Sequence, residues 1–267
     1  MLIFNLVDTR AYFTAATSGI SLYRSLDVNI PLQLNSHKLT IIKSAKYLNK
    51  IDRDSIYLSP KVKSILIGVL LSDGWIQSRK GWNPRIGFKQ SILHFEYLWR
   101  VYTELSYLIS CPPYLCKTTL KSISTQDRMG GKMFFGVVFF TRQLYCLKEI
   151  RDLFYISNNG SNIWVRTLSP NIYYYFNNLA LAHWIMGDGT RHTNGGLYLC
   201  TNALNNQELV LLINIFILKY DLIPSLHSMG GSRSNEYRIY IPKLDLQNKI
   251  RPNVEKYFVP SMLYKII

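Results

Sequence analysis

One short pattern occurs twice in this chain and constrains its fold more than any other feature. One apolar run ends in Asp73-Gly74, and a second apolar run ends in Asp188-Gly189. Both runs have the character of a buried helix, and the distance between them is about the length of a small domain. Two copies in register predict a duplicated unit with one such helix in each half.

The expected ends of these helices place both aspartates at helix C-termini. Ser59 and Asn177 are suitable N-cap residues, and Pro60 takes the first helical position of the first helix. Gly74 and Gly189 are expected to end the helices, as a glycine after the last turn commonly does. A helix C-terminus favours a cation, and two carboxylates held together repel unless a cation lies between them. The pair therefore predicts a metal site, although either run alone fits an ordinary core helix.

The charge balance predicts a polyanionic partner. The chain has 31 Lys and Arg against 16 Asp and Glu, a formal net charge of +15, and 48% of its residues are hydrophobic. This composition is that of a globular protein, and its charge points to nucleic acid. A membrane surface is the competing interpretation. The longest apolar stretch, residues 209–218, is too short to span a bilayer and contains Asn214, so we expect no membrane partner.

Zinc binding and disulfide bonding are not indicated by the cysteines. Cys111, Cys116, Cys146 and Cys200 show no paired C-x-x-C spacing, so we expect reduced thiols in a reducing compartment. His183 lies within the second apolar run and is expected to be an interior residue rather than a ligand. The frequent Ile, Asn and Tyr suit an AT-rich, organellar reading frame.

Both halves show the same expected order of elements: helix, two strands, helix, two strands, helix. In the first half we expect strands at 75–79, 85–90, 114–121 and 134–141 and further helices at 92–109 and 143–155. In the second half we expect strands at 197–202, 225–229 and 237–241, a helix from Asn205 to Lys219, and a last helix from Pro242. We therefore predict an α+β fold with an N-terminal extension of unknown role and two αββαββα halves, at residues 1–58, 59–158 and 159–267.

Alternation in the expected strands separates an apolar face from a basic one. In the second strand, Ile86 and Phe88 point one way, and Arg85 and Lys89 point the other way. Helices cover one face of such a sheet, so the basic face is left to solvent, where a β-ribbon can enter a DNA major groove. A solvated polar face is the alternative for any one residue. The candidate DNA-contacting residues are Gln77, Arg79, Arg85, Lys89, Lys117, Lys121, Arg191, Arg233 and Arg238.

The two Asp-Gly motifs and the closing segment from Val259 to Lys265 resemble the LAGLIDADG homing endonucleases, in the two-repeat, single-chain form typical of organellar group I introns. His183 and Trp184 depart from the small residues of that signature. The resemblance implies a monomer with two LAGLIDADG helices at its centre and two antiparallel sheets that form a DNA-binding saddle. It also implies double-strand cleavage of a long pseudo-palindromic DNA site by an organelle-encoded protein, in the mitochondrion rather than the chloroplast.

The resemblance also assigns roles to residues of the site. Hard carboxylate ligands favour Mg2+ over Zn2+, and the implied metal ligands are Asp73, Asp188 and the backbone carbonyls of Ser72 and Gly187. Gln90 matches the position that orients a water, with Asn202 as its nearest match in the second half. The implied cations near the scissile phosphate are Lys265 and Arg166.

A maturase, which binds its own group I intron RNA and promotes splicing, is the alternative function within the same resemblance. The paired aspartates favour the nuclease, whereas the basic stretch at residues 37–50 would suit an RNA partner. Both activities in one chain are compatible with the sequence. A DNA-binding regulator without catalysis is the third hypothesis and the least favoured, because it needs no paired acids.

Overall fold

The computed structural model describes residues 48–79, 81–119, 133–157, 164–201, 204–230 and 236–267. Lys121, Asn202 and Arg233 lie outside these residues, so their predicted contacts are not described. Two helices occupy the centre: α4 (Pro60–Leu71) and α8 (Asn178–Asp188). No helix in the described ranges is both long and apolar enough to cross a bilayer.

A four-stranded antiparallel sheet follows each central helix. The first sheet has the strand order β1-β2-β4-β3, and the second has the order β7-β8-β10-β9. Because corresponding strands take corresponding places, the predicted pseudo-symmetry and the α+β class are confirmed. The strands are β1 (Gly74–Gln77), β2 (Arg85–Ser91), β3 (Tyr114–Thr119), β4 (Met133–Phe140), β7 (Gly189–Arg191), β8 (Leu197–Cys200), β9 (Ser225–Ser228) and β10 (Tyr237–Ile241).

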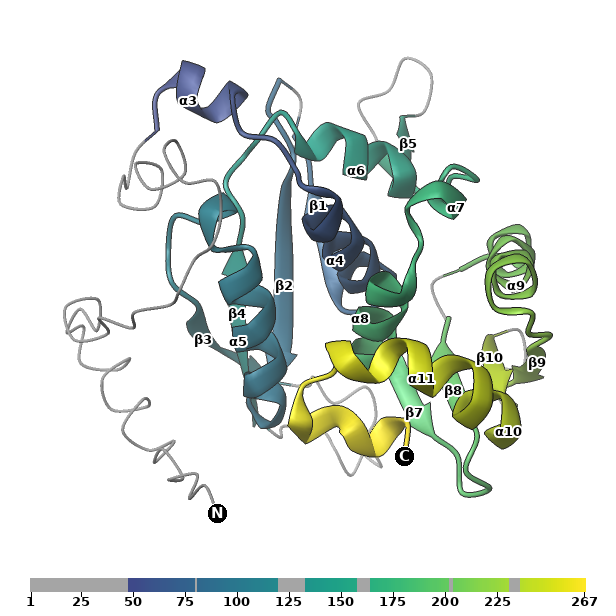
Figure 1. Ribbon diagram of the computed structural model, residues 1–267. Helices are drawn as coiled ribbons and strands as arrows, with labels where there is room; N and C mark the ends of the chain where they lie inside the picture. The colour runs from purple at the N-terminus through teal and green to yellow at the C-terminus, as the bar shows by residue number, and fades with distance from the viewer. Residues whose placement is uncertain (1–47, 80, 120–132, 158–163, 202–203, 231–235) are drawn as a thin grey trace, which may run out of the picture.

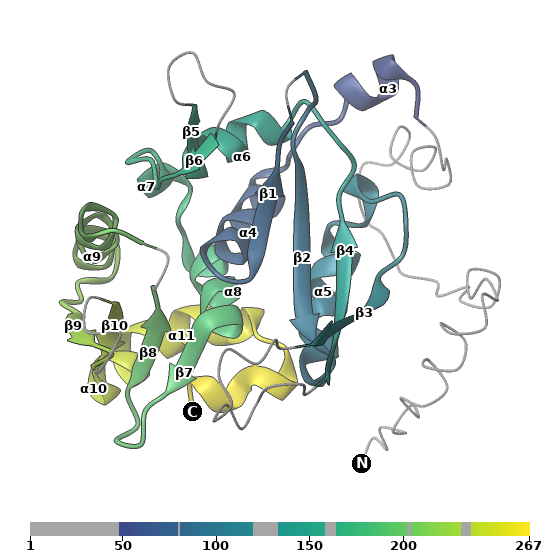
Figure 2. The same cartoon turned by 180° about the vertical axis from the view of Figure 1, so that it is seen from behind.

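The remaining helices lie around the central pair (Figure 1). They are α3 (Lys50–Asp54), α5 (Phe95–Glu104), α6 (Leu147–Phe154), α7 (Ile172–Tyr175), α9 (Asn206–Tyr220), α10 (Lys243–Asp245) and α11 (Arg251–Val254). Helix α5 packs against the first sheet. In Figure 1, α5 and α11 lie in front of the strands. Figure 2 shows the opposite side, where the strands of both sheets face the viewer. The open faces of the two sheets therefore lie on the same side of the protein, as the predicted saddle requires.

The central helices pack against each other along buried faces. Most of α4 is buried, from Val62 to Leu71, and α8 is buried from Ala180 to Met186. A Cβ atom on Gly68 would lie 2.3 Å from the Ala180 carbonyl oxygen and 2.5 Å from His183 Cβ. Gly68 therefore permits an approach that no larger residue allows. Gly68 and His183 each lie five residues before their aspartate, so a small residue faces a large one across the pseudo-symmetric contact.

The predicted starts of the central helices are confirmed, and Gly189 is the C-cap of α8 as predicted, whereas α4 is capped by Ser72 before Gly74 is reached. Ser59 Oγ accepts the N–H of Val62, and Asn177 Oδ1 accepts the N–H groups of Leu179 and Ala180. Gly74 and Gly189 do not adopt the left-handed cap conformation, because neither has a positive φ. They begin β1 and β7.

These two glycines allow each strand to turn tightly against the helix that it follows. A Cβ atom on Gly74 would lie 2.8 Å from the Val69 carbonyl oxygen, and one on Gly189 would lie 2.4 Å from the Ile185 carbonyl oxygen. The glycines of the two motifs are thus explained by close approach rather than by a left-handed cap.

Two predicted helices, those at 92–109 and 143–155, differ from the structure in length, and one strand pair was not predicted. The helix expected at 92–109 is α5 with a 3-10 turn on either side, Ile92–His94 and Ser106–Leu108. Helix α6 ends at Phe154 because the chain becomes extended at Tyr155 and forms a short antiparallel pair, β5 (Tyr155–Ser157) with β6 (Trp164–Arg166). The sequence analysis missed this pair, since three-residue strands carry too little alternation to be recognised.

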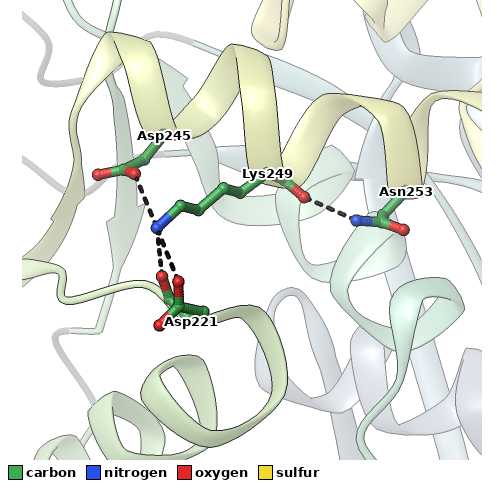
Figure 3. Close-up of polar contacts among 4 residues, drawn as sticks. All are labelled: Asp221, Asp245, Lys249 and Asn253. Carbon is green, nitrogen blue, oxygen red and sulfur yellow. Dashed lines mark hydrogen bonds and ion pairs between the residues drawn. The ribbon is translucent and has the colours of Figure 1, made fainter.

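The C-terminal segment is tied to the end of α9. Asp221 ends α9 in the left-handed conformation, with a φ of 48°, and its backbone carbonyl accepts a hydrogen bond from Lys249 Nζ. The same ammonium lies 3.4 Å from carboxylate oxygens of Asp221 and Asp245, and Asn253 Nδ2 donates to the Lys249 carbonyl at 2.7 Å (Figure 3). These contacts position the segment that continues through the 3-10 helix Pro260–Lys265.

Candidate active site

The C-terminal ends of α4 and α8 meet at the two aspartates. Asp188 is the last residue of α8, and Asp73 follows Ser72, the C-cap of α4. A Cβ atom on Gly187 would lie 2.4 Å from Ser72 Oγ and 3.2 Å from Asp73 Oδ2. The backbone of the second motif therefore lies directly against the first aspartate, as the duplication predicted.

Burial makes both carboxylates less acidic, and repulsion by Asp73 adds to this effect at Asp188. Desolvation, followed by the charge of Asp73, raises the pKa of Asp188 to about 7, against opposing effects of Lys265 and Arg166. Desolvation also raises the pKa of Asp73, while the hydrogen bond from Gln90 and the charges of Lys265 and His94 act in the other direction. Burial thus disfavours the charged form of both carboxylates, and a cation bound beside them would favour it.

Gln90 contacts the first aspartate directly. It is buried on β2, and its Nε2 donates to Asp73 Oδ2 at 2.5 Å. The register of the second sheet places Thr201 immediately after β8 in the corresponding position, because Gly189 pairs with Leu199 as Gly74 pairs with Phe88. The Thr201 hydroxyl donates to the Tyr237 carbonyl at 2.6 Å. Thr201, not the predicted Asn202, is therefore the structural counterpart of Gln90.

Two cations contact the ends of the central helices. Lys265 is buried, and its Nζ lies 2.6 Å from the Met186 carbonyl oxygen and 3.2 Å from that of Gly187. Burial lowers the pKa of Lys265, whereas the charges of the two aspartates act to raise it. Arg166 Nη2 donates to the Leu70 carbonyl at 3.2 Å. Each helix thus receives one cation at the end where its dipole is negative.

The comparison with known proteins identifies the family. The sequence profile described as the LAGLIDADG DNA endonuclease family matches residues 63–248, which is more than half of the chain. This chain belongs to that family.

Curated LAGLIDADG relatives include both maturases and endonucleases. The cytochrome b mRNA maturase bI2 of Saccharomyces cerevisiae is 28% identical over 243 residues, which cover 85% of this chain and 55% of that protein. The chain thus spans about half the length of that relative. The protein of the same name from Debaryomyces hansenii is 29% identical, with 86% of this chain and 82% of that protein covered. A probable intron-encoded DNA endonuclease 3 of Mycosarcoma maydis is 30% identical over 44% of this chain and 82% of its own length.

A solved LAGLIDADG structure shares the fold. The homing endonuclease I-WcaI, bound to its DNA recognition sequence, matches with a TM-score of 0.66 and 22% identity, covering 89% of this chain and 96% of that protein.

His183 is an interior residue of the second LAGLIDADG helix, as predicted. It is buried, and Tyr97 Oη lies 3.2 Å from His183 Nδ1 and donates to the His183 carbonyl at 3.0 Å. Burial lowers the pKa of His183 to about 3, so its ring is neutral at physiological pH. The departure from the LAGLIDADG signature is thus accommodated by Gly68 opposite and by a tyrosine from α5.

On the open face of the first sheet, three of the predicted DNA-contacting residues lie together: Gln77, Arg85 and Lys89. Arg85 and Lys89 alternate on β2 with the buried Ile86 and Phe88, as expected. Arg85 Nε donates to Gln77 Oε1 at 2.8 Å. The register places Lys117 on the other face. Val137 pairs with the inward Gln90 on one side and with Leu115 on the other, so Leu115 also points inward. Lys117 lies two residues after Leu115 on the same strand and therefore shares its face. A Lys117 contact with DNA remains a prediction, separate from that basic face.

A cavity of about 470 Å³ adds two residues that the sequence analysis missed. It lies between the β1–β2 hairpin and the β5–β6 pair and is lined by Gln77, Arg79, Arg85, Arg151 and Trp164, among others. The Arg151 guanidinium lies 3.8 Å from the centroid of the Trp164 ring. No sequence signal identifies this site, because strand β6 was not predicted. It is β6 that brings Trp164 beside Arg151 of the preceding helix α6.

In the second sheet the predicted basic residues do not share one face. Arg238 pairs with Cys200 and shares the open face, whereas Arg191 pairs with the buried Leu197 and lies on the helix side by register, although it is exposed. Aromatic side chains fill the open face instead: His192, Tyr198, His227 and Tyr240. The sequence analysis missed them, although Tyr198 and Tyr240 alternate with buried residues in their strands.

Asp188 is expected to destabilise the metal-free protein at neutral pH. Its pKa is raised from 3.8 to about 7 on folding, so the wild type loses stability as the pH rises from about 4 through about 7. Asp188→Asn should remove this loss and raise the free energy of unfolding at about pH 8 by on the order of 2 kcal/mol, with little change at about pH 4. Urea unfolding in a chelator, with the exposed Asp54→Asn as control, measures this difference. A difference that does not grow with pH would contradict it.

Proposed function

We propose that this protein is a sequence-specific, Mg2+-dependent endonuclease that cuts both strands of a long double-stranded DNA site. The observation that carries the proposal is the meeting of Asp73 and Asp188 at the C-terminal ends of two packed helices. Cleavage of two strands needs two acidic centres close together, and the duplicated helix supplies one from each half. Family membership and relatives named as intron-encoded endonucleases support it.

The residues present fit a divalent cation bound through oxygen. No group of three or more His, Cys, Asp or Glu side chains in the described ranges is placed to hold a metal. A cation here would therefore depend on the carboxylates of Asp73 and Asp188 together with backbone carbonyls, of which those of Ser72 and Gly187 are the nearest in sequence. Burial raises the pKa of both aspartates, and a bound cation would favour their ionised forms. Carboxylate and carbonyl oxygens are the ligands that Mg2+ accepts.

In such a site, bound Mg2+ supplies an activated water and stabilises the charge on the leaving oxygen. Gln90 holds the Asp73 carboxylate in one orientation through its hydrogen bond. Lys265 brings positive charge to the negative ends of both helices, because it lies within electrostatic reach of both aspartates. In the role proposed, Lys265 and Arg166 also counter the charge that accumulates at the scissile phosphates.

The proposed partner is duplex DNA, bound across the two open sheet faces by one chain acting as a monomer. I-WcaI, which has the same fold, was solved with its DNA recognition sequence, and the net charge of +15 suits a polyanion. An organelle-encoded protein of the mitochondrion fits relatives that are maturases of cytochrome b mRNA.

The direct test is cleavage of DNA that spans the joined exons of the host gene. We expect linear product from such a plasmid in the presence of Mg2+ and none with a chelator. The control is the same plasmid with the intron inserted, which should stay intact because the insertion interrupts the site. Equal cleavage of both plasmids would reject sequence-specific homing, and no cleavage of either would reject the nuclease.

DNA affinity is expected to fall steeply with salt. If six or more phosphates are contacted, affinity should fall by about 10³ or more between about 50 and 200 mM salt, because counterions are released on binding. Lys89→Ala should lower the affinity, and Lys117→Ala, on the other face of the sheet, should lower it less. Gel shifts in Ca2+ at several salt concentrations measure both effects. A flat salt dependence would argue against binding across the basic faces.

A maturase function is the second candidate, favoured by the names of two relatives that each cover about 85% of this chain. It predicts that the protein promotes splicing of its own group I intron RNA in vitro. Replacing both aspartates by asparagine should then leave splicing intact while DNA cleavage is lost. Splicing that fails with this double variant would tie both activities to the acidic site.

A further inference from the structure

The open face of the second sheet carries a cluster of four aromatic rings, which we name the Tyr–His cluster: His192, Tyr198, His227 and Tyr240. The centroids of His227 and Tyr240 are 4.7 Å apart in a stacked arrangement, and those of Tyr198 and Tyr240 are 5.0 Å apart. His192 lies 5.2 Å from Tyr198 and 5.8 Å from Tyr240. Apart from the stacked His227 and Tyr240, the rings meet edge-to-face or tilted, so the four rings form one contiguous cluster.

The Tyr–His cluster faces away from the core. Tyr198 pairs directly with Tyr240, while their strand neighbours Leu197, Leu199 and Ile239 are fully buried on the other face. All four rings are partly exposed. In Figure 2, β7 and β8 lie on the side turned away from α11, so the helices that cover the apolar face do not cover this one.

The polar atoms of the cluster are largely used inside the protein. The Tyr198 hydroxyl lies 2.9 Å from His227 Nδ1, and the Ser225 hydroxyl lies 3.0 Å from His227 Nε2. His192 Nδ1 accepts the backbone N–H of Asn194 at 3.2 Å. A surface that reads base edges in a duplex needs uncommitted donors and acceptors. Because these donors and acceptors are hydrogen-bonded within the protein, the cluster presents mainly ring surface to solvent.

The pseudo-symmetric place on the first sheet has a different character. There Gly87 takes the position of Tyr198, and Phe140 takes that of Tyr240, with the Arg85 guanidinium 4.6 Å from the Phe140 ring. Trp75 lies over Gly87 and packs edge-to-face on Phe140, with ring centroids 5.6 Å apart, so the first sheet offers two rings beside Arg85 where the second sheet offers four. The second sheet offers an aromatic cluster with one neighbouring cation, Arg238, whose guanidinium lies 5.9 Å from the Tyr198 ring.

Arg238 adds the electrostatic half of the site. Its Nε is buried and has no hydrogen-bond partner among the residues that the structure describes. The guanidinium lies beside the aromatic cluster, where a phosphate adjoining a stacked base would lie. Proteins that bind single-stranded nucleic acid combine such cations with aromatic rings on which bases stack.

We propose that the Tyr–His cluster binds an unpaired nucleobase of a single-stranded nucleic acid by stacking, with Arg238 contacting the adjoining phosphate. In duplex DNA the ring faces of the bases are already stacked on one another, so a duplex has no base face to offer this cluster. Unpaired bases in RNA loops and bulges do have a free ring face that can stack on these side chains. The site extends the function proposed above and does not depend on DNA cleavage.

The test compares Tyr240→Leu with Phe140→Leu, its counterpart on the first sheet, in the full chain. The probes are single-stranded RNA and DNA oligonucleotides of one sequence, each carrying a 2-aminopurine whose fluorescence falls on stacking. We expect quenching on binding to the wild type. Tyr240→Leu should weaken single-strand affinity by about tenfold or more and remove the quenching, whereas Tyr240→Phe and Phe140→Leu should keep both. Tighter binding of the RNA probe would identify RNA as the source of the base, and equal binding would extend the site to any single strand.

Duplex DNA binding by the same variants separates this site from the proposed nuclease. Tyr240 lies on a face proposed to bind duplex DNA, so Tyr240→Leu should weaken duplex binding by a smaller factor than single-strand binding, and circular dichroism should show that the variant is folded. If Tyr240→Leu does not fold, His227→Leu on the neighbouring strand carries the same expectation. The proposal is overturned if the wild type shows no quenching, or if Tyr240→Leu and Phe140→Leu weaken single-strand binding equally. If the wild type does not cleave DNA, the proposed nuclease is rejected, but the result for single-strand binding still stands.

Discussion

Asp73→Asn and Asp188→Asn are each expected to abolish double-strand cleavage, with a loss of about 10³-fold or more, equivalent to about 4 kcal/mol in the activation barrier. The reason is that the two acids share one environment. The charge of Asp73 raises the pKa of Asp188, and Lys265 acts on both. Removing either charge should weaken cation binding for both strands. Residual activity should be nicking of one strand.

Plasmid cleavage that resolves supercoiled, nicked and linear DNA measures this loss. Gel shifts in Ca2+ should show that both variants still bind the site, because the basic strands rather than the acids hold the DNA. Asp54→Asn, an exposed residue at the end of α3, is the matched control and should cleave normally. Full linearisation by either single variant would refute the shared acidic site.

Gly68→Ala is expected to lower the free energy of unfolding by about 3 kcal/mol or more. In an isolated helix the same change would stabilise by about 1 kcal/mol, because alanine favours helix more than glycine does. Here the new methyl group would lie 2.3 Å from the Ala180 carbonyl oxygen and 2.5 Å from His183 Cβ. Backbone of the facing helix cannot move aside without separating the two central helices, so the clash dominates.

Urea unfolding of the metal-free protein tests this expectation. The control is Gly136→Ala, whose new Cβ atom would meet Lys89 Cε at 2.9 Å and the Gln90 carbonyl oxygen at 3.1 Å. The first contact is the movable end of a side chain, so a smaller loss is expected. A Gly68→Ala protein as stable as the wild type would show that the helices pack less closely than described.

Local patterns in the sequence were sufficient for most of the helices and strands and for the family. The N-caps at Ser59 and Asn177, the capped helix from Asn205, and the strand Tyr237–Ile241 follow from side chains that act within a few residues. The repeated Asp-Gly motif predicted that two acids would meet, because two copies of one helix packed side by side bring their corresponding ends together. The burial of His183 followed from the apolar run around it.

Contacts between segments far apart in the chain depended on the tertiary structure. Thr201 rather than Asn202 corresponds to Gln90 because the strand register places Thr201 there. A shift of one residue would turn each side chain to the opposite face of the sheet. Register likewise put Lys117 on the helix side and gathered the Tyr–His cluster from three strands and a turn. The meeting of the two aspartates could thus be predicted from the sequence itself. Their hydrogen bonds, their raised pKa values and the unequal faces of the two sheets arise only when distant residues pack together and exclude water.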